Sequence, residues 1–205
     1  YASGAFLVKN ARDYSVKGFG APYLQWKAGS DRGPYTLEGS RSAAGAVATW
    51  LTARTLGLGP EGLGRILGRT LKAKKDFEEL LLTRVPGVRV IPACDTNVLC
   101  FTVAEEGASI SKANQKMEAL TRHFSPEGEA EFTLSKTKLS TKNYSRFLRS
   151  TVAEWKGHWD ANELVLARAC LMNPFFSSKE TRVHYGDRLA SAIKDWIASG
   201  KAMIA

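Results

Sequence analysis

The sequence predicts an α/β fold that ends in an antiparallel sheet with helices packed on one face. From residue 61 onward, segments with helical periodicity and short β-rich segments follow the order helix, strand, strand, helix, strand, strand, helix, with one further helix inserted. The hydrophobic share of 44% in 205 residues is enough for a sizeable core. An antiparallel sheet with helices on one face is the economical arrangement for that order.

The first part of the chain combines a short apolar strand with a long loop and two helices. A strand is predicted over 5–8, and glycines and a proline interrupt regular structure over 10–32. A helix over 42–56 ends at the glycines that follow it, and Pro60 starts a second helix that runs from about 61 to 82. The apolar stripe of the second helix is predicted to contain Leu63, Ile66, Leu67, Leu71, Leu80 and Leu81.

The later elements follow from the same periodicities. Strands are predicted over 88–91, 98–103, 131–139 and 164–171, and helices over 111–123, 144–155 and 179–199. Ser177 and Glu180 have the spacing of a capping box for the last helix. Residues 57–62 fit the dinucleotide pattern G-x-G-x-x-G, but they follow a helix where that motif needs a strand, so we interpret them as a helix-to-helix joint.

Composition and charge exclude several classes of function. The net charge is +9, but the basic residues are spread along the chain, and no basic segment is interleaved with aromatic residues as in proteins that stack bases. We therefore expect no nucleic-acid partner. No run approaches the roughly 18 apolar residues that cross a bilayer, so no membrane partner is expected either. The densest basic group has the pattern of a solvated helix face: Arg65, Arg69, Lys72, Lys74 and Lys75.

Cysteine and histidine spacing indicates no metal site. Cys94, Cys100 and Cys170 are odd in number and too scattered for a metal or redox motif. We interpret them as buried thiols in a reducing compartment, which predicts a cytoplasmic protein. The three histidines lack the paired spacing of zinc ligands.

A polar strip before the first long helix is the clearest candidate site. Residues 33–42 bring Ser40 and Arg41 to the start of an apolar helix, where backbone N–H groups and the helix dipole favour anions. A hydroxyl and a guanidinium there suit a phosphate or a carboxylate. The alternative is that Ser40 or Ser42 caps the helix and binds nothing else.

Four segments in a fixed order carry a resemblance to a known family: YASGAFLV at 1–8, APYLQW at 21–26, LEGSRS at 37–42 and LVLARACLMNP at 164–174. Together they resemble the C-terminal half of the group II pyridoxal-phosphate-dependent amino-acid decarboxylases. The resemblance implies a fold-type I transferase, with the end of the large cofactor-binding domain and its mobile loop at 1–46. The small C-terminal α+β domain would then comprise 47–205.

The resemblance also implies an activity and partners. The expected reaction converts an L-amino acid to an amine and carbon dioxide with pyridoxal 5'-phosphate, in a cytoplasmic homodimer. The family's Schiff-base lysine would precede this chain. The upstream half of the same enzyme is therefore an expected partner, and the chain alone is expected to be inactive.

Roles for individual residues follow from the same resemblance. Tyr23 matches the mobile-loop tyrosine that protonates the former α-carbon, and a phenol with a pKa of about 10 stays protonated at neutral pH. Ser40 matches a position near the cofactor phosphate and the substrate pocket, and Arg41 would brace the turn. Arg168 matches an arginine that recognises the substrate carboxylate. The sequence departs from the animal aromatic decarboxylases in a shorter spacing from Tyr23 to Ser40.

Other interpretations of these residues and of the chain remain open. Tyr23 would otherwise pack at a domain edge, and Arg168 would form a buried ion pair with an aspartate or glutamate, since a lone buried charge is unfavourable. The chain would otherwise belong to a carbon–carbon lyase or an aminotransferase of the same fold. A third alternative is a non-catalytic dimerisation or interaction domain.

Overall fold

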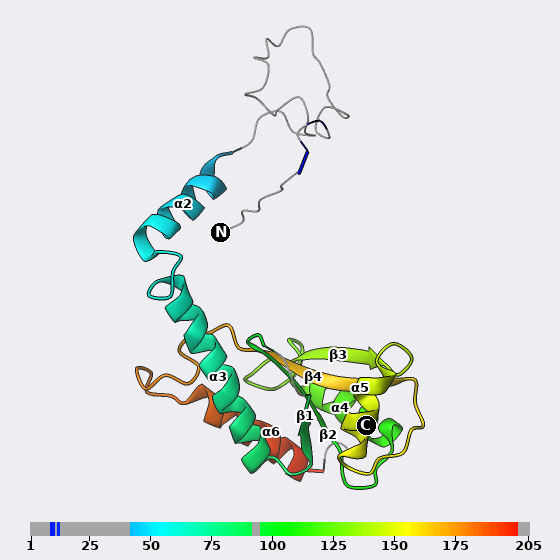
Figure 1. The fold of residues 1–205 in the computed structure, drawn as a ribbon. Coiled ribbons are helices and arrows are strands. Elements are labelled where there is room, and N and C mark those ends of the chain that lie inside the picture. The colour runs from blue at the N-terminus through cyan, green and yellow to red at the C-terminus, as the bar shows by residue number, and fades with distance from the viewer. Residues whose placement is uncertain (1–8, 11, 13–41, 92–94, 201–205) are drawn as a thin grey trace. The chain divides into compact units, whose positions relative to one another are not determined.

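The structure is a computed structural model that describes residues 9–10, 12, 42–91 and 95–200 (Figure 1). The strand predicted over 5–8 lies outside the described residues, as does almost all of the predicted loop over 10–32. The chain divides into two units, Tyr1–Leu63 and Gly64–Ala205. The predicted assignment of 1–46 and 47–205 to a large and a small domain stays a prediction.

Helix α2 (Ala44–Leu56) confirms the helix predicted in the first unit. The hydroxyl of Ser42 accepts a hydrogen bond from the Ala44 N–H at 3.2 Å, and the helix ends at Gly57, whose positive φ of 74° suits glycine. No side chain of α2 is buried, although the helix is apolar. Trp50 is 60% exposed, and the Arg54 guanidinium lies 5.8 Å from the centre of its ring, so α2 presents apolar surface.

Helix α3 (Leu63–Arg84) begins two residues later than predicted, and Pro60 lies in the turn before it rather than in its first turn. The predicted apolar stripe is wrong at Ile66, Leu67 and Leu71, which are exposed. The buried face is instead an adjacent stripe at the same helical period, in which Phe77 packs edge-on against Phe176: Thr70, Ala73, Phe77 and Leu81. Leucines on both sides of that stripe made its position around the helix ambiguous.

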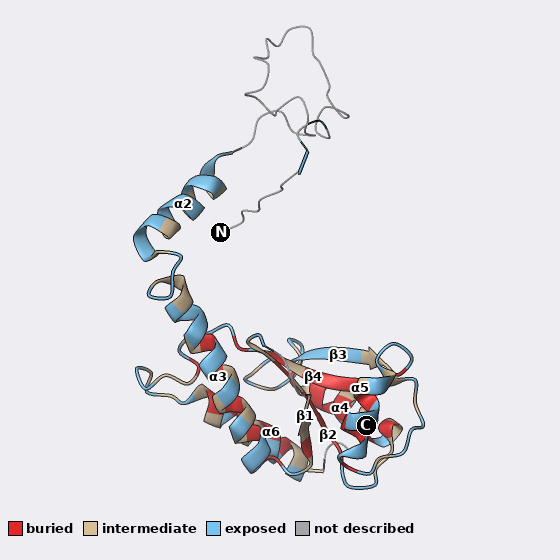
Figure 2. Cartoon of the chain, viewed as in Figure 1, coloured by how far each residue is buried: buried red, intermediate tan, exposed pale blue. Residues whose placement is uncertain are grey.

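The four strands form one antiparallel sheet, as predicted. They are β1 (Val88–Val90), β2 (Val98–Val103), β3 (Ser135–Ser140) and β4 (Glu163–Cys170), in the spatial order β1-β2-β4-β3. Strand β3 begins four residues later than the predicted 131–139 segment. The central position of β4 explains why its sequence is an almost continuous apolar run, since both of its faces are covered over much of its length (Figure 2).

The sheet has two different faces, because alternate residues of a strand point in opposite directions. On the first face, side chains such as Phe101 and Val165 share a core with α3, the second half of α4 (Ile110–His123) and α6 (Tyr185–Ala198). On the second face, Leu164 and Leu166 share a core with α5 (Ser145–Ala153) and Trp155. The prediction of helices on one face is therefore wrong for α5, whose position the order of elements did not reveal.

The last helix differs most from its predicted start. It begins at Tyr185 rather than near 179, and its N-cap residue, His184, makes no side-chain capping bond. The predicted capping box is wrong: the Ser178 hydroxyl accepts the Glu180 N–H at 3.0 Å within a turn before the helix. A serine with a glutamate nearby favours such local turns as readily as a helix start.

Candidate functional site

Three of the four site residues predicted from the sequence lie outside the described residues. These are Tyr23, Ser40 and Arg41, so their roles stay predictions. Helix α2, which follows them in the sequence, begins at Ala44, two residues after its predicted start at Ser42. Arg168 is described, and the candidate site is centred on it.

Arg168 lies near the middle of the sheet, on β4. Its cross-strand partners are Cys100 of β2 and Ser135 of β3. The residue is partly buried, but its Nε atom has no solvent contact and no hydrogen-bond partner. Among the described residues, no carboxylate lies within ion-pair distance of it. Within the part of the chain that the structure describes, Arg168 therefore does not form the ion pair with an aspartate or glutamate that was the alternative interpretation.

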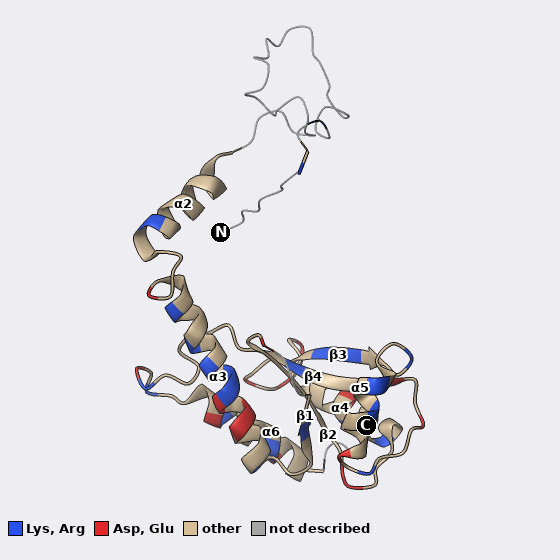
Figure 3. Cartoon of the chain, viewed as in Figure 1, with Lys and Arg blue, Asp and Glu red and all other residues tan. Residues whose placement is uncertain are grey.

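Arg168 shares its face of the sheet with a second arginine, which no sequence pattern had singled out. Arg89 on β1 pairs directly with Thr102 on β2, and Thr102 lies two residues from Cys100 on the same strand face. Arg89 has the same signature as Arg168: it is partly buried, its Nε is shielded from solvent, and that atom has no partner. Figure 3 shows basic residues on both β1 and β4.

Strand β4 is held in place by an asparagine that no motif identified. The pairing of β2 with β4 extends to Phe101 opposite Ala167. Beyond that point Asn114 of α4 takes the place of a strand: its Oδ1 accepts the Val165 N–H at 2.8 Å, and its Nδ2 donates to the Glu163 carbonyl at 2.7 Å. The side-chain amide therefore fixes the start of the strand that carries Arg168.

Trp155 closes the second face at the end away from Arg168. Its indole ring is fully buried, and its Nε1–H donates to the Ala108 carbonyl at 2.9 Å. Gly157 fits beside this ring because a Cβ atom there would lie 2.2 Å from the indole nitrogen. The tryptophan, α5 and the leucines of β4 make this end of the face apolar and closed.

The lysines of β3 occupy the opposite face from Arg168 and are already paired. Lys136 donates to Glu118 of α4 at 2.6 Å, and Lys138 donates to Glu163. The hydrogen bond from Lys136 holds the pKa of Glu118 below its ordinary value, and the bond to Glu163 raises the pKa of Lys138. These carboxylates are therefore engaged on the first face rather than available to Arg168.

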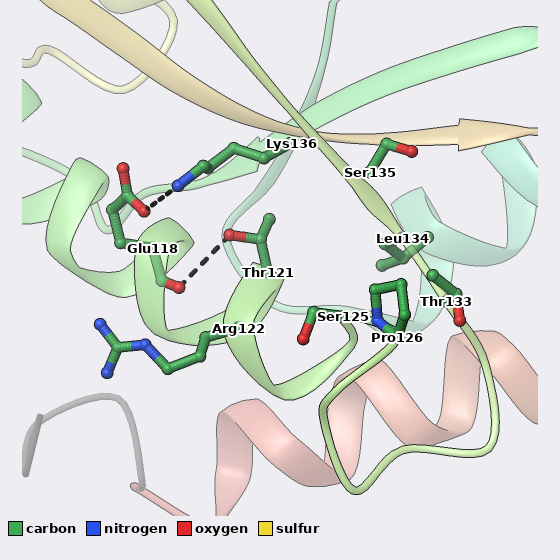
Figure 4. A pocket seen from close by; sticks show the side chains of 9 residues that line it. All are labelled: Glu118, Thr121, Arg122, Ser125, Pro126, Thr133, Leu134, Ser135 and Lys136. Carbon is green, nitrogen blue, oxygen red and sulfur yellow. Dashed lines mark hydrogen bonds and ion pairs between the residues drawn. The ribbon is translucent and has the colours of Figure 1, made fainter.

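A hollow of about 470 Å³ lies between the end of α4 and the start of β3 (Figure 4). Glu118 and Lys136 face each other across its rim, and Arg122 points away from them. The Thr121 hydroxyl is satisfied by the Met117 carbonyl at 2.8 Å. Arg168 is not among the described residues that line this hollow, and Glu118 and Lys136 in its lining are paired with each other.

Three further predictions can be compared with the described residues. The cysteines are not uniformly buried: Cys170 is exposed and Cys100 is partly buried, whereas Cys94 lies outside the described residues. Within the described ranges, His, Cys, Asp and Glu side chains form no group of three or more that could hold a metal ion. In the same ranges no helix is long and apolar enough to cross a membrane.

Comparison with known proteins supports the predicted relationship over almost the whole chain. No protein-family model matches. The L-tyrosine decarboxylase of Enterococcus faecium is 25% identical over 216 residues, which cover 95% of this chain and 35% of that protein. The L-tyrosine decarboxylase of Levilactobacillus brevis is 24% identical, with 95% and 34% covered. The same values describe the L-tyrosine decarboxylase of Enterococcus faecalis.

The chain spans about a third of the length of the curated relatives that it matches, and it corresponds to their C-terminal part. The four-stranded antiparallel sheet with its helices is compatible with that position.

Proposed function

We propose that this chain is the C-terminal portion of a pyridoxal-phosphate-dependent decarboxylase that converts an L-amino acid to an amine and carbon dioxide. The observation that carries the proposal is the similarity to three L-tyrosine decarboxylases along 95% of the chain. L-tyrosine is therefore the first substrate to test. The lysine that binds the cofactor belongs to the upstream part of the polypeptide, and the assembled enzyme is a cytoplasmic homodimer of fold type I.

The cofactor supplies one kind of chemistry when it is bound: its protonated ring accepts the electron pair that remains as the carboxylate leaves. The described part of the chain fits an amino-acid ligand at one point, the shielded and unpartnered Nε of Arg168, which can donate to a carboxylate. Ser40 would donate a hydrogen bond from its hydroxyl to the phosphate of the cofactor, and Arg41 would brace the turn that holds Ser40.

Tyr23 is proposed to hold the proton that completes the reaction. A phenol is protonated at neutral pH and can deliver its proton to the former α-carbon once the carboxylate has left. Arg168 orients the substrate through its carboxylate.

One observation favours a second candidate function, an interaction or dimerisation domain. Helix α2 exposes Val47, Trp50 and Leu51 along one side, and an exposed apolar side of this kind is typical of surface that another protein segment covers. The two functions are compatible if α2 packs against the rest of the enzyme. If the assembled polypeptide has no decarboxylase activity, only the interaction function remains.

The decisive experiment uses the full-length polypeptide that contains this segment. The purified protein is expected to absorb in the imine band with pyridoxal phosphate and to release carbon dioxide and amine from L-tyrosine. Tyr23→Phe should keep cofactor absorbance and lose most amine formation. Equal loss of both would contradict the proton-donor role. A cofactor-free, inactive full-length protein would support the interaction domain instead.

A further inference from the structure

The polar atoms left without partners in the described part of the chain gather on a single surface. Four buried side-chain atoms of the described residues lack a hydrogen-bond partner: Arg89 Nε, Thr102 Oγ1, Thr137 Oγ1 and Arg168 Nε. The strand register places all four on the second face of the sheet, because Arg89 pairs with Thr102, and Thr137 lies on the same side of β3 as Ser135, the partner of Arg168. Unsatisfied buried groups are rare in folded proteins, so a cluster of four requires an explanation.

The two arginines lie close enough to act on one ligand. Strands β1 and β4 are separated by β2 alone, which places their backbones about 10 Å apart. Arg89 is opposite Thr102, Arg168 is opposite Cys100, and these two β2 residues are neighbours on one face. Two extended arginine side chains can span such a separation from either side of β2.

The chemistry of the four groups identifies the class of ligand. Guanidinium groups donate only, and a threonine hydroxyl can also donate, so the missing partner is an acceptor with several lone pairs and a negative charge. A carboxylate has two oxygens that accept in the planar geometry of a guanidinium fork. No described carboxylate supplies this, because none lies within ion-pair distance of either arginine, and Glu118 and Glu163 are engaged by lysines on the opposite face.

We propose that Arg89 and Arg168, with the hydroxyls of Thr102 and Thr137, form one carboxylate-binding site on the second face of the sheet. Arg89 is the new member, and its assignment deepens the role proposed for Arg168. The site itself follows from the geometry, whereas its use by an amino-acid substrate rests on the proposed function. The carboxylate comes either from that substrate or from a side chain of the upstream polypeptide, and arginine labelling of the full-length polypeptide separates these sources.

The first experiment uses the 205-residue chain and acetate. The Nε–Hε resonances of arginine are followed by NMR during titration, and those of Arg89 and Arg168 are expected to shift along one saturable curve. Arg89→Gln should weaken acetate binding at Arg168 about tenfold or more, because it removes a charge-assisted donor. Arg122→Gln is the matched control, since Arg122 is exposed and lies on the rim of the other hollow, and it should leave the curve unchanged.

Two results of the titration would overturn the proposal. One is a linear, parallel shift of all arginines, which indicates general ion screening. The other is saturable binding of phosphate with none of acetate. Should Arg89→Gln unfold, Arg89→Lys keeps the charge but loses the planar fork, and an undiminished acetate affinity in this variant would likewise argue against two guanidinium donors.

The second experiment uses the full-length polypeptide and phenylglyoxal, which labels accessible arginines. Labelling of Arg89 and Arg168 is read by mass spectrometry without and with added L-tyrosine. In at least one of these two states it should be about tenfold slower or more than in the 205-residue chain. Protection without added amino acid identifies a carboxylate of the polypeptide, and protection only with L-tyrosine identifies the substrate. Labelling as fast as in the 205-residue chain in both states refutes the site. If the arginines are protected but no decarboxylation occurs, the site stands and the proposed function fails.

Discussion

The two faces of the sheet are built from the same four strands but are completed differently. On the first face, Phe101 and Val165 are covered by three helices of the chain, and the lysines at its edge have carboxylate partners. The second face is closed at one end by α5 and Trp155, and elsewhere it leaves Arg89 and Arg168 without partners among the described residues. We infer that the first face stabilises this chain, whereas the unpaired arginines of the second face suit the proposed carboxylate.

The largest effect is expected from the first face. Phe101→Ala removes a fully buried ring and should lower the free energy of unfolding by about 3–5 kcal/mol, through lost burial and the cavity left behind. Urea unfolding of the 205-residue chain measures this change. Leu82→Ala, at a residue 56% exposed, is the control and should stay within about 0.5 kcal/mol of the parent. Similar losses at both positions would show that the first face is not a packed core.

The next effect concerns the junction between α4 and β4. Asn114→Ala leaves the Val165 N–H and the Glu163 carbonyl without their partners, which should cost about 1–3 kcal/mol in the same assay. Asn114→Asp separates the two hydrogen bonds, because it keeps an acceptor for the Val165 N–H but loses the donor to the Glu163 carbonyl. It should therefore show at least part of the destabilisation expected for Asn114→Ala. If Asn114→Ala has the same urea midpoint of unfolding as the parent chain, the amide does not fix β4.

A smaller effect separates satisfied from unsatisfied threonines. Thr102→Val removes a buried hydroxyl without a partner and should be neutral or stabilising by up to about 1 kcal/mol in the isolated chain. Thr141→Val removes a hydroxyl that donates to the Asn162 carbonyl at 2.8 Å, and it should destabilise by about 1 kcal/mol. Equal destabilisation by both changes would mean that the Thr102 hydroxyl has a partner, and the contrast between the two faces would weaken.

The smallest effect is the pH dependence of the first face. Because the pKa of Glu118 lies below its ordinary value in the folded chain, its pairing with Lys136 stabilises the fold above the unfolded pKa near 4.5. That stabilisation is lost as the pH falls through the folded pKa. Glu118→Gln should therefore reduce the difference in urea midpoint between pH 7 and pH 3, and Glu127→Gln, at an exposed glutamate, should not. An unchanged difference in Glu118→Gln would show that the ion pair does not stabilise the first face.

Much of the fold after residue 61 was predictable, because the periods of helices and strands are local properties of the sequence. The strands at 98–103 and 164–171 and the helix at 111–123 agree with β2, β4 and α4 within a residue or two. The errors arose where a choice depends on distant partners. The buried stripe of α3 is fixed by what packs against it, and the start of α6 by a local turn around Ser178.

The site was predictable only in part. Arg168 was conspicuous because a charge interrupts an apolar strand, and Tyr23, Ser40 and Arg41 came from motifs of a known family. Arg89 also stands between apolar residues, but in a strand of only three residues a single polar side chain between two apolar ones is ordinary alternation. Its significance depends on the register that places it opposite Thr102, and register between strands cannot be obtained from local patterns.

The proposed decarboxylase activity can be measured as the release of carbon dioxide from carboxyl-labelled L-tyrosine by the full-length polypeptide supplied with pyridoxal phosphate. We expect release by the parent protein and a large loss of release in Tyr23→Phe at unchanged cofactor absorbance. A full-length protein that binds the cofactor yet releases no carbon dioxide from tyrosine or any other amino acid would contradict the proposed function.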